Sequence, residues 1–182
     1  MAALVDSSFD AAFWFIDRAL ETGEYMQPQK LQRLLYLSQA YFAVAYDGRM
    51  LMPALFVANS LGPVEPGVFR LFETAIPSFE RKPLPKTART FLDAIWRRFG
   101  HHSAAYLSKL TMGHTPFQDA LARGEGSVIG LKEMAAFYGR KAMPDGSGLP
   151  TADSVVPPRM LLSQHGQAVQ VRKWSPPAGK KS

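Results

Sequence analysis

Histidines are the side chains in this sequence best suited to acid–base chemistry or metal binding at neutral pH, and three of the four lie at His101, His102 and His114. Adjacent residues point in different directions on a helix, so His101 and His102 do not form the spaced pair that a metal site uses. The His-x-x-x-His pair with a glutamate is absent. The spacing predicts no metal site, and a hydrolase that pairs His101 or His102 with a carboxylate is only a third hypothesis.

Other catalytic signatures are also missing from the sequence. There is no cysteine, which excludes disulfides, thiolate nucleophiles and cysteine-containing zinc sites. Neither a glycine-rich phosphate loop nor a Gly-x-Ser-x-Gly elbow occurs, and the aspartates and glutamates are scattered singly. We therefore expect a protein that is not an enzyme and that needs no cofactor.

The positive charge leaves several kinds of partner open. A formal net charge of +6 and a pI near 9.7 suit a nucleic acid, an acidic protein or an anionic surface. Half of the excess lies after Pro144, where a solvated basic end is the simpler explanation. The best candidates for a nucleic-acid surface are Arg81, Lys82, Lys86, Arg89, Arg97 and Arg98. A DNA-binding transcriptional regulator is the less favoured alternative function.

The elements that would position these residues are mostly helices. With 182 residues, the chain is long enough for one domain and a tail. We expect a mainly α fold, a single bundle of six or seven helices with a small C-terminal β-hairpin. Apolar periodicity, capping residues and glycine stops predict helices near 7–22, 28–46, 87–99, 103–112, 115–123 and 127–138, and a further helix that begins at Pro66.

The helix expected from Pro28 to Tyr46 is apolar over most of its circumference, which places it at the centre of the bundle. A short run then follows from Met50 to Asn59, which is either a buried extended segment or a single helical turn. The sequence Gly62-Pro63-Val64-Glu65-Pro66 predicts a rigid turn, because two prolines fix φ there. Glu65 is either the cap of the next helix or a contact with a partner.

The composition changes near residue 144, so we expect a helical domain at 1–143 and a C-terminal extension at 144–182. Within the extension, apolar and polar residues alternate from Gln167 to Trp174, and His165-Gly166 before them suits a two-residue turn. This pattern predicts a β-hairpin. The N-terminus resembles no secretory signal, and no apolar run is long enough to cross a membrane. These features predict a cytoplasmic protein.

Three blocks of this sequence resemble the Panacea antitoxin domain, whose members include SocA-like antitoxins and phage-associated GepA-like proteins. The blocks are 30–36 (Lys-Leu-Gln-Arg-Leu-Leu-Tyr), 39–41 (Gln-Ala-Tyr) and 62–69, from the Gly-Pro-Val-Glu-Pro segment to Val68-Phe69. A weaker likeness extends over about residues 6 to 140, with the SocA-like antitoxins as the nearest branch. Two departures are Phe117, where the family often has tryptophan, and Ala58-Asn59, where it commonly has Ala-Trp.

The resemblance implies a non-enzymatic antitoxin of a bacterial toxin-antitoxin system, which acts by binding its cognate toxin protein. For the SocA branch it further implies a proteolytic adaptor that delivers the toxin to the ClpXP protease. The toxin itself cannot be named from the domain. We expect partner contacts from the Gly-Pro-Val-Glu-Pro segment and from the exposed side of the second helix, at Tyr36, Gln39, Gly62, Pro63, Glu65 and Phe69.

Overall fold

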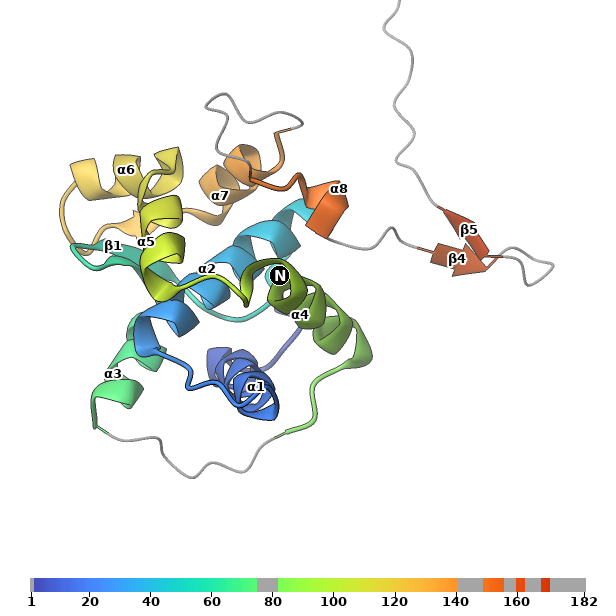
Figure 1. Ribbon diagram of the computed structural model, residues 1–182. Coiled ribbons are helices and arrows are strands. Elements are labelled where there is room, and N and C mark those ends of the chain that lie inside the picture. The colour runs from blue at the N-terminus through green and yellow to red at the C-terminus, as the bar shows by residue number, and fades with distance from the viewer. Residues whose placement is uncertain (1, 75–81, 141–148, 156–159, 163–167, 171–182) are drawn as a thin grey trace, which may run out of the picture.

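The computed structural model of the protein describes residues 2–74, 82–140, 149–155, 160–162 and 168–170 (Figure 1). Within these residues the chain is mainly helical, as predicted. The helices are α1 (Ser8–Glu21), α2 (Pro28–Ala45), α3 (Pro66–Thr74), α4 (Lys86–Phe99), α5 (Ala104–Met112), α6 (Thr115–Ala122), α7 (Leu131–Tyr138) and α8 (Ala152–Val155). The strands are β1 (Phe56–Asn59), β2 (Gly62–Val64), β3 (Val128–Ile129), β4 (Met160–Leu162) and β5 (Ala168–Gln170).

The second helix is the axis of the fold, as its apolar circumference predicted. Helices α1, α4, α5 and α7 pack around α2 and bury every residue from Lys30 to Ala43 (Figure 1). Pro28 begins the helix, and positive φ angles at Asp47 and Gly48 follow its end. The prediction of an exposed side on this helix is wrong for residues 30–43, because the polar side chains there are buried as well.

A three-stranded antiparallel sheet lies among the helices. The sequence did not predict the sheet, but strand β1 agrees with the extended alternative for the run from Met50 to Asn59. Its strand order is β2-β1-β3, and Val57 of β1 pairs with both Val64 and Val128. Residues 127–130 were predicted as the start of the last long helix. They instead form β3 and the N-cap of α7, whose Glu133 carboxylate accepts the Gly130 N–H at 2.7 Å.

The Gly-Pro-Val-Glu-Pro segment is not the rigid turn that we predicted. Its first three residues form strand β2, and the reversal occurs at Ser60-Leu61. The Asn59 side chain accepts the Leu61 N–H at 2.9 Å, which closes this turn. A proline is tolerated at Pro63 because β2 lies at the edge of the sheet, where an N–H is not required.

A second antiparallel pair joins β4 and β5 within the C-terminal extension, with Met160 opposite Gln170 and Leu162 opposite Ala168. The residues between these two strands, and those after residue 170, lie outside the described part of the chain. The β4-β5 pair lies where the C-terminal hairpin was predicted, whereas the β1-β2 hairpin that packs among the helices was not predicted.

Three tyrosines form the aromatic centre of the helical core. The Tyr41 ring lies 5.2 Å from that of Tyr138, and the Tyr36 ring lies 6.1 Å from the same ring. The Tyr41 hydroxyl donates to the Pro150 carbonyl at 2.8 Å, so α2 holds the described segment that leads into α8. The Tyr138 hydroxyl lies 2.7 Å from Nδ1 of the buried His114.

Candidate functional site

Two polar side chains of α2 hold the β1-β2 hairpin in place. The Gln32 side-chain oxygen accepts the Glu65 N–H at 2.8 Å. The Arg33 guanidinium donates through Nη1 to the Pro63 carbonyl at 2.7 Å, through Nη2 to the Leu61 carbonyl, and through Nε to the Ser108 hydroxyl at 3.2 Å. The contacts with the hairpin join residues that are about 30 positions apart in the chain, and the contact with Ser108 joins residues that are 75 positions apart. We call Gln32 and Arg33 the α2 clamp.

Arg33 is unusual because it is a buried cation whose described partners are all neutral. Only 1% of its surface is exposed, and its acceptors are two backbone carbonyls and one hydroxyl. Burial lowers the pKa of Arg33 to about 10, so the guanidinium still carries its charge at neutral pH. The hydrogen bonds of this charged group replace those that it would make with water.

The clamp also closes the free edge of the sheet. Arg33 occupies the outward carbonyls of Leu61 and Pro63, and Pro63 has no N–H to offer. An incoming strand would therefore find neither acceptors nor a donor along this edge. We conclude that a partner does not add a strand at β2 while the clamp is formed.

Glu65 acts as the cap of α3, which answers the question that the sequence left open. Its Oε1 accepts the Gly67 N–H at 3.2 Å, and its Oε2 accepts the Val68 N–H at 2.6 Å. The side chain is 8% exposed, and the Glu65 carbonyl accepts the Phe69 N–H. A carboxylate in this place satisfies the first N–H groups of the helix and faces the positive end of its dipole.

Replacing Gly62 with alanine is expected to lower the free energy of unfolding by about 3 kcal/mol. The backbone at Gly62 has a φ of +113°, and a Cβ there would overlap the Arg33 guanidinium. Gly48→Ala is the matched control, because Gly48 has a φ of +80° with no atom within 4 Å of an added Cβ. It should cost only the backbone strain, about 1 kcal/mol. Equal losses in chemical denaturation would contradict the close contact with Arg33.

The structure separates the predicted partner-binding residues into two groups. Gly62, Pro63 and Glu65 meet at the α2 clamp, and Phe69 follows them, half-buried, on α3. The other two predicted residues, Tyr36 and Gln39, lie deep in the core.

Tyr36 is 0% exposed, and its ring packs edge-on against Phe56. Gln39 is 1% exposed and binds the backbone of Leu51 and Met52 through three hydrogen bonds of 3.0 to 3.1 Å. Direct contact of either residue with a partner would require the elements around α2 to move. Of the two departures from the Panacea pattern, Phe117 is 0% exposed and affects packing, whereas Asn59 is partly exposed near the tip of the β1-β2 hairpin.

An exposed apolar surface lies on the hairpin that the clamp holds. Val57 faces outward in β1, and its partner Val128 in β3 is 45% exposed. Leu55 directly precedes β1 and is 63% exposed. Leu61, at the tip, is 48% exposed. We call Leu55, Val57, Leu61 and Val128 the hairpin surface; the sequence did not single out any of them.

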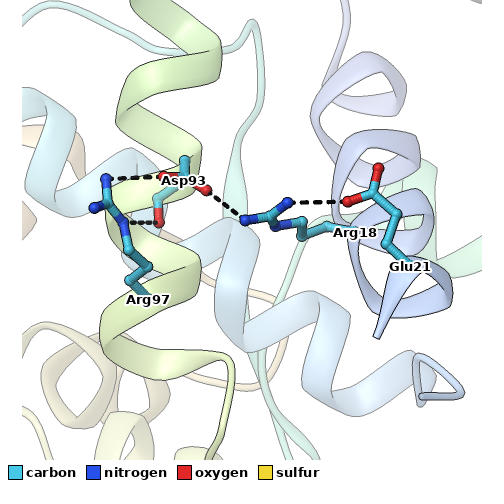
Figure 2. A network of polar contacts seen from close by, with 4 residues as sticks. All are labelled: Arg18, Glu21, Asp93 and Arg97. Carbon is cyan, nitrogen blue, oxygen red and sulfur yellow. Dashed lines mark hydrogen bonds and ion pairs between the residues drawn. The ribbon is translucent and has the colours of Figure 1, made fainter. Parts of the chain in front are cut away.

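A second surface lies between α1 and α4, which an ion-pair network joins. Figure 2 shows Arg18 between Glu21 of its own helix, at 2.9 Å, and Asp93 of α4, at 3.0 Å. Arg97 binds the other oxygen of Asp93 at 2.8 Å. Beside this network is a groove of about 500 Å³ whose apolar lining includes Phe13, Trp14, Pro83 and Leu84.

The basic residues predicted as a nucleic-acid surface do not form one continuous face. Arg97 is paired with Asp93, which lies between it and Arg89 on the same stripe of α4. Lys82 is 3.6 Å from Asp6, and Arg81 lies outside the described residues. Arg98 follows Arg97 by one position and so lies on a different side of the helix, where its charge acts on His102.

The adjacent histidines contact each other and a tyrosine. The ring centroids of His101 and His102 are 4.0 Å apart, and those of His102 and Tyr106 are 4.1 Å apart. The described residues place no carboxylate against either histidine, so the hydrolase hypothesis has no acid–base pair to build on here. In the same part of the chain, no group of three or more histidine or acidic side chains is arranged to hold a metal ion.

Comparisons of the chain with protein-family models, with curated proteins and with solved structures give no match. Among the described helices, none is both long and apolar enough to cross a lipid bilayer.

Proposed function

We propose that this protein is an antitoxin that binds its cognate toxin protein through the hairpin surface. The observation that carries the proposal is the α2 clamp. The sequence blocks that resemble the Panacea domain, at 30–36 and 62–69, meet through the hydrogen bonds of Gln32 and Arg33. The resemblance thus concerns residues that build one local structure, and that structure presents an exposed apolar hairpin.

The chemistry of the hairpin surface suits a protein partner. Three of its four aliphatic side chains are 45% to 63% exposed, although leucine and valine are usually buried. Exposed apolar side chains on a surface are often used in protein–protein contacts, and Val57 and Val128 are cross-strand partners. Because Arg33 occupies the Leu61 and Pro63 carbonyls, we do not expect a toxin to extend the sheet at the β2 edge.

Co-purification with the product of the adjacent gene tests this proposal. A toxin-antitoxin pair is encoded together, so the tagged protein should retain its neighbour's product as a stable complex through affinity and size-exclusion steps. A correctly folded protein that emerges alone, with both proteins expressed at comparable levels, would contradict the proposal.

Replacing Leu55 with aspartate is expected to weaken binding of that partner at least about ten-fold. The side chain is 63% exposed, so the charge should change the surface and leave the stability of the free protein nearly unchanged. Leu20 of α1 is also 63% exposed and lies outside the hairpin surface, which makes Leu20→Asp the matched control. Titration calorimetry should show a loss for Leu55→Asp alone; equal affinities for both variants would exclude the hairpin surface as the binding site.

We further propose that the protein acts in the cytoplasm as a proteolytic adaptor that delivers the toxin to the ClpXP protease. This step rests on the resemblance to the SocA branch. The half-life of the purified partner in the presence of the protease should shorten when this protein is added. An unchanged half-life, with complex formation intact, would favour simple sequestration of the toxin.

A further inference from the structure

The junction of α4 and α5 carries a short column of stacked rings. The ring planes of His101 and His102 are inclined by 40°, and those of His102 and Tyr106 by 21°, with centroid separations of 4.0 and 4.1 Å. His101 and Tyr106 are the two ends of the column, and both are exposed. Tyr106 is 46% exposed, so a further planar group can continue the stack.

Basic side chains act on the middle ring of this column. The pKa of His102 is lowered by partial burial and then by His101, Arg98 and Lys30, so the charged groups that act on this imidazole are all basic. Lys30 is held 5.5 Å above the Trp96 ring and 3.4 Å from Glu24, which offsets part of its charge. Arg98 is exposed and forms no ion pair within the described residues. The positive potential at the column therefore depends mainly on Arg98.

We propose that the column of His101, His102 and Tyr106 binds a single-stranded nucleic acid, with a base stacked on Tyr106 and a backbone phosphate beside Arg98. Exposed aromatic rings combined with cations are the recurring means by which proteins hold single strands, because every base has a face to stack and every nucleotide carries a phosphate. Such a site is tolerant of sequence. It is also separate from the hairpin surface and does not depend on the proposed antitoxin function.

A single strand fits the column better than a duplex does. In a duplex the faces of the bases are already stacked on one another, so Tyr106 could reach only an end of the helix. An acidic peptide would satisfy Arg98 but would leave the exposed ring of Tyr106 without a planar partner. Duplex DNA and polyglutamate are therefore the competitors that distinguish a stacking site from a general attraction of anions.

Fluorescence anisotropy with a labelled oligothymidylate tests the proposal on the full chain. Tyr106→Ala should weaken binding about ten-fold, and Tyr106→Phe should retain it. Arg98→Ala should weaken binding about five-fold at low salt and reduce the salt dependence by about one phosphate contact. Arg97→Ala removes the same charge from the adjacent position, where the side chain is 66% exposed and paired with Asp93, and should have little effect.

A second measurement reports on the site without depending on affinity. A phosphate beside His102 would stabilise its imidazolium, so saturation with the oligonucleotide should raise the His102 pKa in an NMR titration. Equal losses for Arg97→Ala and Arg98→Ala, an unchanged affinity for Tyr106→Ala, or equal competition by polyglutamate would each overturn the proposal. Failure of the wild-type protein to bind the oligonucleotide would overturn it as well.

Discussion

Arg33→Ala is expected to lower the free energy of unfolding by about 4 kcal/mol, the largest effect of any single substitution proposed for this protein. The substitution removes three hydrogen bonds of a charged donor and leaves the Pro63 carbonyl without its donor. It also empties the volume of a side chain that is only 1% exposed. The β2 edge of the sheet should become free to pair with other chains, so aggregation on heating should increase.

Two further variants of Arg33 separate the contributions of its charge, its volume and its hydrogen-bond donors to the free energy of unfolding. Arg33→Met preserves much of the volume but leaves both carbonyls without partners, so it should remain destabilising. Arg33→Lys keeps the charge but cannot reach two carbonyls and a hydroxyl with the same planar fork, and should lie between wild type and alanine. A methionine variant as stable as wild type in urea denaturation would show that the hydrogen bonds of the clamp contribute nothing to stability.

A double-mutant cycle that combines Gly62→Ala with Arg33→Ala tests the contact between these two residues. An added Cβ at Gly62 clashes with the guanidinium, so its cost should fall when Arg33 is already alanine. The remaining cost should approach the backbone strain alone, about 1 kcal/mol, as for Gly48→Ala. Strict additivity would mean that the two residues do not touch.

Alkaline pH is expected to unfold the protein through its three core tyrosines. Burial raises the pKa values of Tyr36, Tyr41 and Tyr138 above their ordinary value, so these hydroxyls stay neutral in the folded chain. The unfolded chain ionises them from about pH 10, and a group with a raised folded pKa loses its stabilising contribution as the pH rises. Three tyrosines remove about 4 kcal/mol of stability for each pH unit above that point.

Arg33 acts in the opposite direction over the same range. Its folded pKa is lowered to about 10, so the folded chain releases this proton before the unfolded chain does. Above about pH 10, Arg33 therefore raises the free energy of unfolding by about 1.4 kcal/mol for each pH unit. Together with the three tyrosines, this leaves a net loss of stability of about 3 kcal/mol for each pH unit.

Tyrosinate absorbance and helical circular dichroism, followed together, provide the measurement. The absorbance of the buried tyrosines should appear only as the helical signal disappears. Tyr36→Phe should move the transition to higher pH, because it removes one of the buried phenols whose ionisation unfolds the chain. Complete ionisation of all six tyrosines in a protein that is still helical would contradict the account.

The helices could be predicted because their signals are local. Pro28 and Gly48 mark the limits of α2, Ser7 and Ser103 accept the first N–H groups of α1 and α5, and apolar spacing supplies the buried faces. The sheet could not be predicted in this way. Its strands are only two to four residues long, and their pairing depends on residues that are distant in sequence.

The sequence identified only part of the candidate site, because the rest of the site also depends on contacts between residues that are distant in sequence. The Gly-Pro-Val-Glu-Pro segment was recognised, but Gln32 and Arg33 were not singled out as site residues, although both lie in the block 30–36. Their burial is possible because acceptors and donors about 30 residues further along the chain return to meet them. The sequence did contain one signal for this site, the polar pair Gln32 and Arg33 in a helix that is apolar on nearly all sides. Buried polar groups require partners, so this pair indicated contacts with another part of the chain.

The hairpin surface carries the central claim, that this protein neutralises a partner by binding it. The most direct test is the growth of cells that express the neighbouring gene, alone and together with this protein. We predict that the wild-type protein and Leu20→Asp restore growth and that Leu55→Asp does not, at equal protein levels. Growth arrest that persists with the wild-type protein, or rescue by Leu55→Asp that equals the wild type, would contradict the account.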